Sequence, residues 1–514
     1  MCCLRGPTPL KDPLKCLWIQ MNGSHLAETI KTTPPLGMSR LAHGRSLLYA
    51  LVVLLPLAAG LLIGRGALLM VLGAIALVVS TGVAWRWPLV STALALLAMG
   101  GYTIFQMTPD FVADALYVGG GVYFQDVVLV GMVAAAILRL AGGRDRRRVA
   151  GLFAPIVGVS AWLVIAVLRN LPATGLSAPG ELRFRYLLLA IPLCLVASLQ
   201  NQRQTRAALW LFVSIAVGLP LVLSPVVLSL KGWSFSWSDR LFPAQVSMGL
   251  LLGLTALWQC RSWLRVPRVL LYVVTGLGAI EIILDSHRSV WLGVAGALVI
   301  LSVSKSGWVP TVRRAAAVIV AVLAATLLAL FTRINIWSVL AERGQAALER
   351  RDTAGWRELV WESTLEQFYA SPTAGRGLGL YWSTYVKELG GEVTIFPHSL
   401  YVMILAHLGV VGMLLFVWLW FAGWRPLLAW RKSGRPVPSA DGRPEELAWL
   451  GMAVLAGSAA WGIAYGFEPY SLTLAGVCLA GVLGTRSRTK AATGSVSREE
   501  VALYRDERRT AGHP

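Results

Sequence analysis

Four arginines and one histidine stand where polar stretches of the chain meet apolar ones: Arg183, Arg185, Arg240, Arg288 and His398. Guanidinium groups bind phosphate through paired, charge-assisted hydrogen bonds. Imidazole is the side chain whose pKa best suits proton transfer near neutral pH. In combination, these residue types could neutralise an anionic ligand and transfer a proton beside it.

Each of these residues also has a purely structural interpretation. Arg183, Arg185 and Arg240 could extend from helix ends to lipid phosphates, and Arg288 could pair with Asp285. A single histidine is more often structural than catalytic. No His, Cys, Asp or Glu group has the spacing of a metal site, and no Walker loop or dinucleotide motif precedes a helix. The sequence therefore predicts neither a metal nor a nucleotide cofactor.

The composition indicates which elements must hold these residues. Of the 514 residues, 56% are hydrophobic and only 14% are charged, with a mean hydropathy of +0.64. Apolar runs of roughly 18 residues or more recur along the chain, and each is long enough to cross about 30 Å of hydrocarbon as a helix. The alternating segments of a membrane β-barrel are absent. The sequence predicts an all-α, polytopic integral membrane protein.

The net charge of +20 does not indicate nucleic-acid binding, because the basic residues cluster in short loops between apolar runs. Such clusters are typical of cytoplasmic loops, where lysine and arginine resist translocation and meet anionic lipid. They occur at Arg144–Arg148, Arg261–Arg268 and Lys305–Arg314.

Apolar runs and basic loops together predict about 12 to 14 transmembrane helices. We expect a polar, basic cytoplasmic leader at 1–45, with the start at Met1, Met21 or Met38 left open. Helices 1–11 are expected within 46–331, helices 12–14 within 399–484, and a cytoplasmic tail at 485–514. The helical ranges are 47–64, 67–85, 88–107, 122–141, 149–168, 185–199, 208–229, 243–260, 269–285, 288–304, 315–331, 399–422, 446–465 and 469–484.

One long segment, 332–398, interrupts this series, and the alternation of sides predicts that it is extracytoplasmic. Within it, apolar residues recur at spacings near three and four and predict an amphipathic helix: Trp356, Leu359, Val360, Leu365, Phe368 and Tyr369. Charged residues occupy intervening positions: Arg357, Glu358, Glu362 and Glu366. A turn from Ser371 to Gly379 comes next, in which glycine permits positive φ. Loops of this length are usually functional or disordered, and the internal pattern favours function.

Three stretches carry a family resemblance. Asp285–Trp291 is similar to a Ser-Arg-Gly-Ala-Trp motif at a helix start, and Gly375–Leu380 to a Gly-x-Gly-Leu-Gly motif. Pro397–Tyr401 followed by Leu405–Gly412 is similar to Pro-His-Asn-x-x-Leu followed by Glu-x-Gly-x-x-Gly. In this order, the motifs resemble the O-antigen ligase/polymerase family of bacterial membrane glycosyltransferases. The chain departs from the pattern at Ser399, where the family has Asn, and at His407, where many members have Glu.

The resemblance implies a GT-C-like fold and an active site that faces the periplasm or exterior of the bacterial inner membrane. It implies transfer of a glycan from a polyprenyl diphosphate donor to an acceptor hydroxyl, without a metal or nucleotide sugar. Arg288 and Arg185 are then expected to bind the diphosphate, with Arg240 and Arg183 as further candidates. His398 would be the general base on the hydroxyl, or would orient donor and acceptor.

Two questions stay open. The acceptor can be a glycan, a lipid or a protein, so ligation and polymerisation of O-antigen or exopolysaccharide are both possible. The alternative function is a multi-span secondary transporter or lipid-linked glycan flippase, which should carry ionisable groups near the middle of the membrane.

A straight helix from residue 399 would place His407 nine residues deeper than His398, about 13 Å at 1.5 Å per residue. We therefore expect His407 to lie outside the reaction.

Overall fold

The computed structural model describes residues 67–105, 117–119, 122–142, 146–174, 186–230, 242, 244–285, 288–302, 353–379, 383–386, 391–394, 398–432 and 444–484. The chain divides into two compact units, Met1–Ala74 and Ile75–Pro514. Of the first unit, only residues 67–74 are described, as the start of helix α3. All other described residues belong to the second unit.

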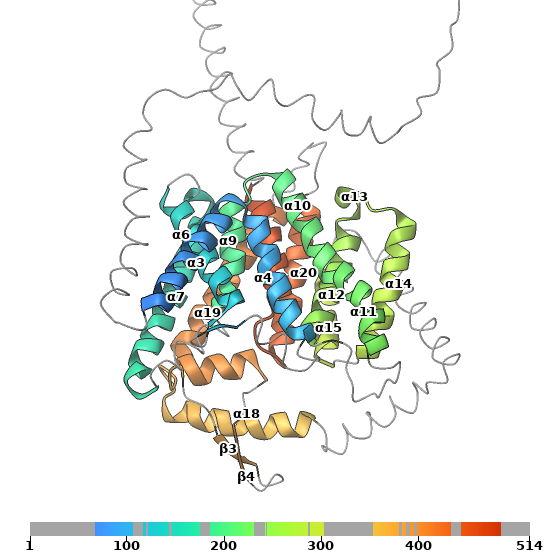
Figure 1. Cartoon of the computed structure of the whole chain (residues 1–514). Coiled ribbons are helices and arrows are strands. Elements are labelled where there is room, and N and C mark those ends of the chain that lie inside the picture. The colour runs from blue at the N-terminus through green and yellow to red at the C-terminus, as the bar shows by residue number, and fades with distance from the viewer. Residues whose placement is uncertain are drawn as a thin grey trace, which may run out of the picture. The chain divides into compact units, whose positions relative to one another are not determined.

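The described elements are mostly helices (Figure 1): α3 (Ala67–Arg86), α4 (Pro88–Phe105), α6 (Phe124–Ala141), α7 (Arg146–Thr174), α9 (Ala190–Ser198), α10 (Gln202–Val213), α11 (Leu219–Leu230), α12 (Ala244–Gln259), α13 (Arg261–Leu264), α14 (Arg268–Asp285), α15 (Arg288–Ser302), α18 (Thr353–Ala370), α19 (Leu400–Lys432) and α20 (Pro444–Gly462). A helix without a label lies at Pro469–Gly484. The 3-10 helix η2 (Leu187–Leu189) leads into α9, and the π-helical segment η3 (Ser214–Gly218) joins α10 to α11. Two antiparallel hairpins, β1 (Tyr117–Gly119) with β2 (Val122–Tyr123) and β3 (Ser383–Val386) with β4 (Gly391–Thr394), complete the described elements.

The all-α, polytopic membrane class is confirmed. Four described helices are long and apolar enough to cross a membrane: Phe124–Ala141, Gly151–Thr174, Gln202–Val227 and Leu400–Trp430. The predicted helices at 47–64 and 315–331 lie outside the described residues. The predicted start at residue 208 was wrong, because α10 already begins at Gln202 with a polar first turn. Asn201 caps that turn, and its side chain accepts a hydrogen bond from the Gln204 N–H at 2.8 Å.

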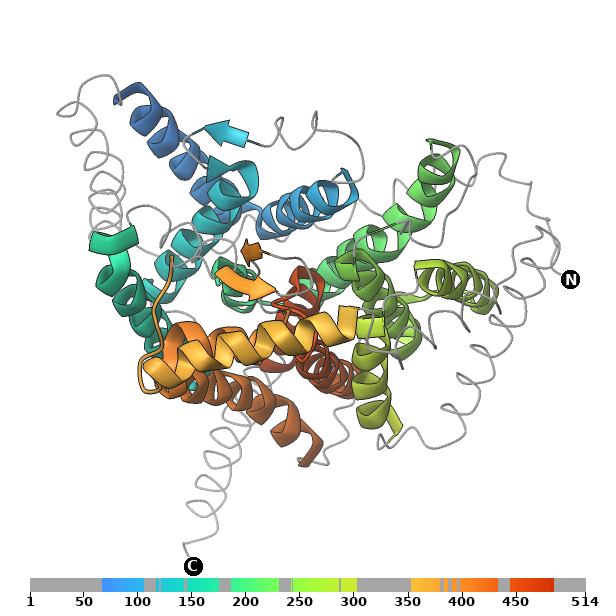
Figure 2. The same ribbon diagram turned by 90° about the horizontal axis from the view of Figure 1, so that it is seen from below.

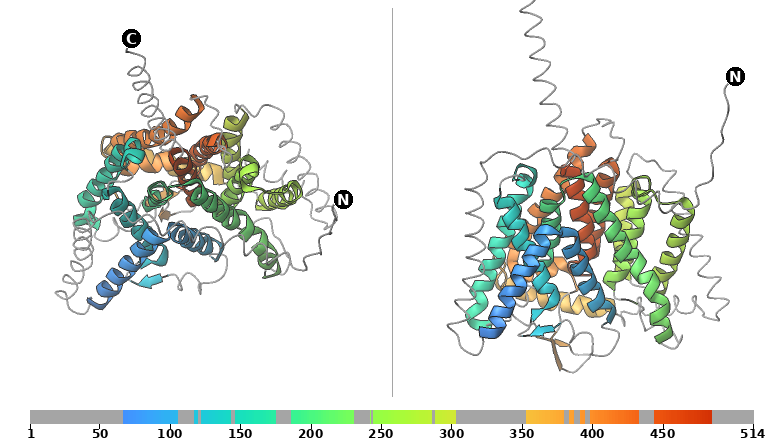
Figure 3. Two further views of the ribbon diagram at one scale, coloured as in Figure 1. Left: turned by 90° about the horizontal axis from the view of Figure 1, so that it is seen from above. Right: turned by 45° about the horizontal axis from the view of Figure 1, so that its top comes forward.

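The helices of the second unit form a bundle, and we call its two ends the α13 end and the α18 end after the helices that lie there (Figure 1, and Figure 3 from two further directions). At the α13 end, the Ser262 hydroxyl donates to Glu446 near the start of α20, at 2.9 Å. At the α18 end, α20 finishes beside the start of α19, where the Leu400 N–H donates to the Tyr465 carbonyl at 2.9 Å. Since α14 starts next to α13 and α15 begins directly after α14, Arg288 lies at the α18 end.

Close packing against α20 fixes the position of α15. A Cβ on Gly296 would lie 2.8 Å from the Ala456 carbonyl oxygen, and one on Gly457 would lie 3.0 Å from the Gly293 carbonyl oxygen. Small residues of this kind let helix backbones approach closely in membranes, where the hydrophobic effect contributes little to association. The helix that begins at Arg288 is therefore held firmly against the helix that ends beside α19.

Helix α18 confirms the predicted helix in the long loop, and it lies across the α18 end of the other helices (Figures 1 and 2). Its buried side runs through Val360 and Thr364, each 2% exposed, while Glu362 and Glu366 point outward. Tyr369, on the predicted apolar face, is 71% exposed.

Candidate functional site

The most consequential feature of this end is a break in α19. Gly409 has φ 67° and ψ −169°, which interrupts the helix between Leu408 and Val410. The first segment, Leu400–Leu408, runs beside α18, whereas the second enters the bundle (Figures 1 and 2). The expectation of a straight helix was wrong. His407, near the end of the first segment, is therefore displaced from His398 along the direction of that segment, and not along the segment that enters the bundle.

The turn that comes after α18 fills this break. Four backbone hydrogen bonds join the turn to α19: Arg376 N–H to Ala406 O at 2.8 Å, Gly377 N–H to His407 O at 2.9 Å, Val410 N–H to Pro372 O at 2.9 Å, and Val411 N–H to Thr373 O at 3.2 Å. A broken helix leaves carbonyls and N–H groups without their usual partners. The turn supplies those partners, and this explains why a break is tolerated in a buried place.

Glycine is required on both sides of this contact. Gly375, Gly377 and Gly379 all have positive φ, at 66°, 87° and 86°, as the sequence pattern predicted. A Cβ on Gly375 would overlap the His407 backbone, and one on Gly409 would overlap the Thr373 carbonyl. The two backbones are too close for any side chain between them.

Side chains of α7 hold the turn and the broken helix α19 in position. Asn170 is buried, and its amide nitrogen donates to the carbonyls of Arg376 at 2.8 Å and Leu378 at 2.9 Å. Arg169 donates to the Gly375 carbonyl. Two turns earlier, the Trp162 indole N–H donates to the Leu408 carbonyl at 3.0 Å, next to the break. One face of α7 therefore binds the turn and the broken helix together.

The two histidines occupy opposite environments. His398 is exposed, and its ring centre lies 5.8 Å from that of Tyr465. The next residue, Ser399, caps the first segment, with its hydroxyl 3.5 Å from the Val402 N–H and from the Gly462 carbonyl. His407 is fully buried, and its Nδ1 lies 3.3 Å from the Tyr186 hydroxyl. His398 is thus accessible on an anchored backbone, while His407 belongs to the packing.

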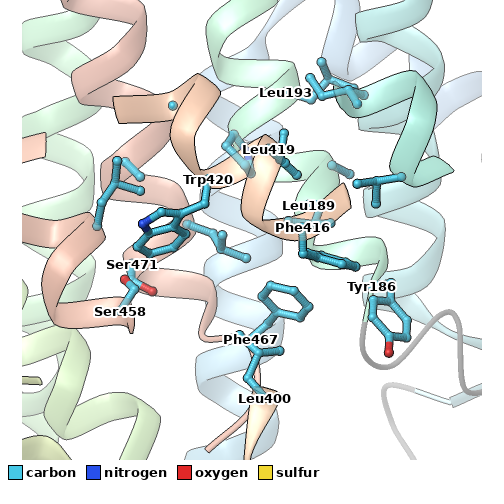
Figure 4. Close-up of a pocket in the computed structure, with 18 of the residues that line it drawn as sticks. Tyr186, Leu189, Leu193, Leu400, Phe416, Leu419, Trp420, Ser458, Phe467 and Ser471 are labelled. Carbon is cyan, nitrogen blue, oxygen red and sulfur yellow. The ribbon is translucent and has the colours of Figure 1, made fainter. Parts of the chain in front are cut away.

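An apolar cavity of about 600 Å³ lies between the helices, lined in part by both segments of α19. The first segment of α19 contributes Leu400 and Ile404 to its wall, and the second contributes Phe416 and Trp420. Figure 4 shows Phe416 and Phe467 facing each other between the rest of the cavity and Leu400. Further lining residues come from α7, α9, α20 and the helix 469–484. The cavity could hold a hydrocarbon chain.

The connection between α20 and the helix 469–484 places one carboxyl group at the cavity wall. Glu468 is 2% exposed and accepts hydrogen bonds from the N–H groups of Tyr470 (2.8 Å) and Ser471 (2.5 Å). Burial raises the pKa of the Glu468 carboxyl to about 8, although these hydrogen bonds act in the opposite direction. The carboxyl caps the helix at 469–484, so its role here is structural.

The predicted site residues are only partly placed. His398 stands at the start of α19, and Arg288 is the first residue of α15 at the same end of the bundle. Arg183, Arg185 and Arg240 lie outside the described residues, although Arg185 immediately precedes Tyr186, the partner of His407.

Sequence reasoning missed the α7 residues. Arg169 and Asn170 are polar residues at the end of an apolar run, which is the criterion that singled out Arg183 and Arg185. Applied to α7, it would have found them. Within the described ranges, no group of three His, Cys, Asp or Glu side chains could hold a metal ion.

A comparison with protein families identifies the region that contains these features. Residues 271–417 match the sequence model of the O-antigen ligase family. Over these residues the chain is similar to that family. The matched region includes α15, α18, the turn Ser371–Gly379, His398 and the break in α19, whereas the α7 residues that hold the turn lie before it. No curated protein matches the chain.

Proposed function

We propose that the chain is a glycosyltransferase of the inner membrane that moves a glycan from a polyprenyl diphosphate to an acceptor hydroxyl at the outer face, in ligation or polymerisation of O-antigen or exopolysaccharide. One observation carries the proposal. Within the region that matches the O-antigen ligase family, the exposed His398 precedes Ser399, the cap of the helix segment that lines an apolar cavity of about 600 Å³.

The cavity suits the lipid part of such a donor. Its wall is formed mainly by aliphatic and aromatic side chains, such as Leu189, Phe416 and Trp420 (Figure 4). Burial of a prenyl chain against such a surface is favourable. The diphosphate would then lie toward the α18 end, where Arg288 begins α15. Arg185, which immediately precedes Tyr186 in the sequence, is the second arginine proposed to bind it.

The reaction forms a bond between the acceptor oxygen and the anomeric carbon, while the bond from that carbon to the diphosphate oxygen breaks. Arginines positioned at the diphosphate would neutralise the charge that develops on the leaving group. His398 would accept the proton of the acceptor hydroxyl. Since Ser399 anchors the adjacent backbone at Gly462, the imidazole would act from a fixed position.

The sidedness of this proposal can be tested independently of activity. The basic loop residues Arg261, Arg265 and Arg268 lie in or next to α13, at the end opposite α18, and this supports an extracytoplasmic α18. A cysteine at Ser371 should react with an impermeant thiol reagent in intact cells, or in spheroplasts if an outer membrane is present. Labelling only after lysis would reject the topology and the proposed site with it.

The function itself is tested by transfer from a purified polyprenyl-diphosphate glycan in nanodiscs, with protein amounts matched. We expect His398→Ala to lose roughly 10²–10⁴-fold in rate, the usual contribution of a positioned acid–base group, while its thermal stability stays unchanged. The exposed Tyr369 supplies the control, since Tyr369→Ala should retain full activity.

Two outcomes would contradict this assignment. An active His398→Ala together with an inactive but stable His407→Ala would show that the catalytic face is wrongly placed. If the wild-type protein transferred no glycan but moved the donor across liposome membranes, the flippase alternative would hold.

A further inference from the structure

A second cavity, of about 450 Å³, lies at the α13 end, far from the site described above. Its wall comes from the end of α12, from α13 with the residues after it, and from the start of α20. The charged residues in this wall are Arg261, Arg265 and Glu446. Glu446 is already engaged, because the Ser262 hydroxyl lies 2.9 and 3.2 Å from its two carboxylate oxygens. The Arg261 Nε–H donates to the Val266 carbonyl at 3.3 Å. With two guanidinium groups and one carboxylate in its wall, the cavity has a net positive charge.

The backbone at Arg265 is unusual. Arg265 has φ 58° and ψ 39°, and among the described residues it is the one non-glycine residue with positive φ. It ends α13, at a position that glycine usually occupies because a side chain is disfavoured in this conformation. The Arg265 guanidinium makes no hydrogen bond or ion pair to another described residue. No contact of the Arg265 side chain with a described residue therefore compensates for the strained backbone conformation.

An apolar surface continues from the cavity along α14. Val269, Val273 and Leu277 lie on one face at spacings of four residues and are 75%, 53% and 51% exposed. Tyr272 joins this surface to the cavity wall, since its ring centre lies 5.5 Å from that of Trp258. A positively charged cavity at a helix end therefore adjoins a strip of side chains suited to hydrocarbon.

We propose that this cavity binds the head group of an anionic phospholipid whose acyl chains lie along α14. The phosphate would be held between Arg261 and Arg265, because basic pockets between helices on the cytoplasmic side favour anionic head groups. Under the topology proposed above, the lipid belongs to the cytoplasmic leaflet. The strained Arg265 is then explained by the ligand, since glycine would fit the backbone better but could not bind phosphate.

Substitution of Arg265 by glycine separates the two explanations. Arg265→Gly keeps, and relaxes, the backbone conformation while it removes the guanidinium. In phosphatidylcholine nanodiscs we expect this variant to unfold at the same temperature as the wild type or at a higher one. Native mass spectrometry after exchange into neutral detergent should show phosphatidylglycerol retained on the wild type. We expect retention roughly tenfold weaker on Arg265→Gly, about the effect of losing one charge-assisted hydrogen bond.

A second variant and a matched control complete the test. Arg261→Gln, which also lines the cavity, should show the same loss of retention. Arg203→Ala removes an exposed arginine from the first turn of α10 at the same end but outside the cavity, and it should retain phosphatidylglycerol fully. The proposal is overturned if Arg265→Gly binds phosphatidylglycerol like the wild type, or if Arg203→Ala loses as much. It is also overturned if inorganic phosphate stabilises the protein as well as the lipid does, since the ligand would then be a free anion.

Discussion

Replacement of Gly409 by alanine tests whether the break in α19 holds the turn Ser371–Gly379 in place. The backbone conformation at Gly409, with φ 67° and ψ −169°, is adopted readily by glycine alone, and another residue costs about 1–3 kcal/mol there. A Cβ would also overlap the Thr373 carbonyl and the Gly375 nitrogen. The bonds from Val410 and Val411 to the turn would then be lost, at about 1 kcal/mol each. We expect a destabilisation of about 3–5 kcal/mol.

Two measurements check this value and its cause. Thermal or denaturant unfolding in nanodiscs gives the loss of stability, and hydrogen exchange of the amides at Arg376 and Gly377 reports whether the turn has come away from α19. Gly423→Ala is the control, because this glycine lies in the regular part of α19 with only Leu455 Cδ1 near its Cβ position, at 3.8 Å. That variant should be as stable as the wild type or more stable. Wild-type unfolding and wild-type amide protection in Gly409→Ala would refute the reasoning.

Substitutions at three further positions probe the site and its surroundings. Arg288→Ala should lose transfer activity while expression persists, and Arg288→Lys should recover little, because lysine lacks the planar fork that binds two phosphate oxygens; full activity of the alanine variant would remove Arg288 from the site. Asn170→Ala should cost about 1–3 kcal/mol and speed amide exchange in the glycine turn, since two carbonyls lose their donor; unchanged exchange would show that α7 does not hold the turn. Between pH 4.5 and 8, folded Glu468 keeps a proton that the unfolded chain has lost, so stability should fall as pH rises through this window. Glu468→Gln should flatten this dependence in thermal unfolding, and an equally steep curve in the variant would assign the dependence to another group.

The sequence alone determined the class of the protein and the positions of most of its helices. Apolar runs of about 20 residues must form helices in a bilayer, because every backbone group there has to be satisfied within the segment. The helix now seen at Thr353–Ala370 and the positive φ of Gly375, Gly377 and Gly379 also result from local patterns. Spacing along a helix and the lack of a Cβ act within a few residues, so one sequence suffices to read them.

Only the tertiary structure decided how the site is assembled. Gly409 and Gly423 look alike in the sequence, since each lies within an apolar run. One breaks the helix and the other does not, because only Gly409 meets a turn that can satisfy the freed backbone groups. The position of this turn depends on a hydrogen bond from Asn170, which lies more than 200 residues earlier in the chain. The break also moved His407 from an expected depth in the membrane to a buried place beside Tyr186, because a contact between distant segments decides where a helix bends.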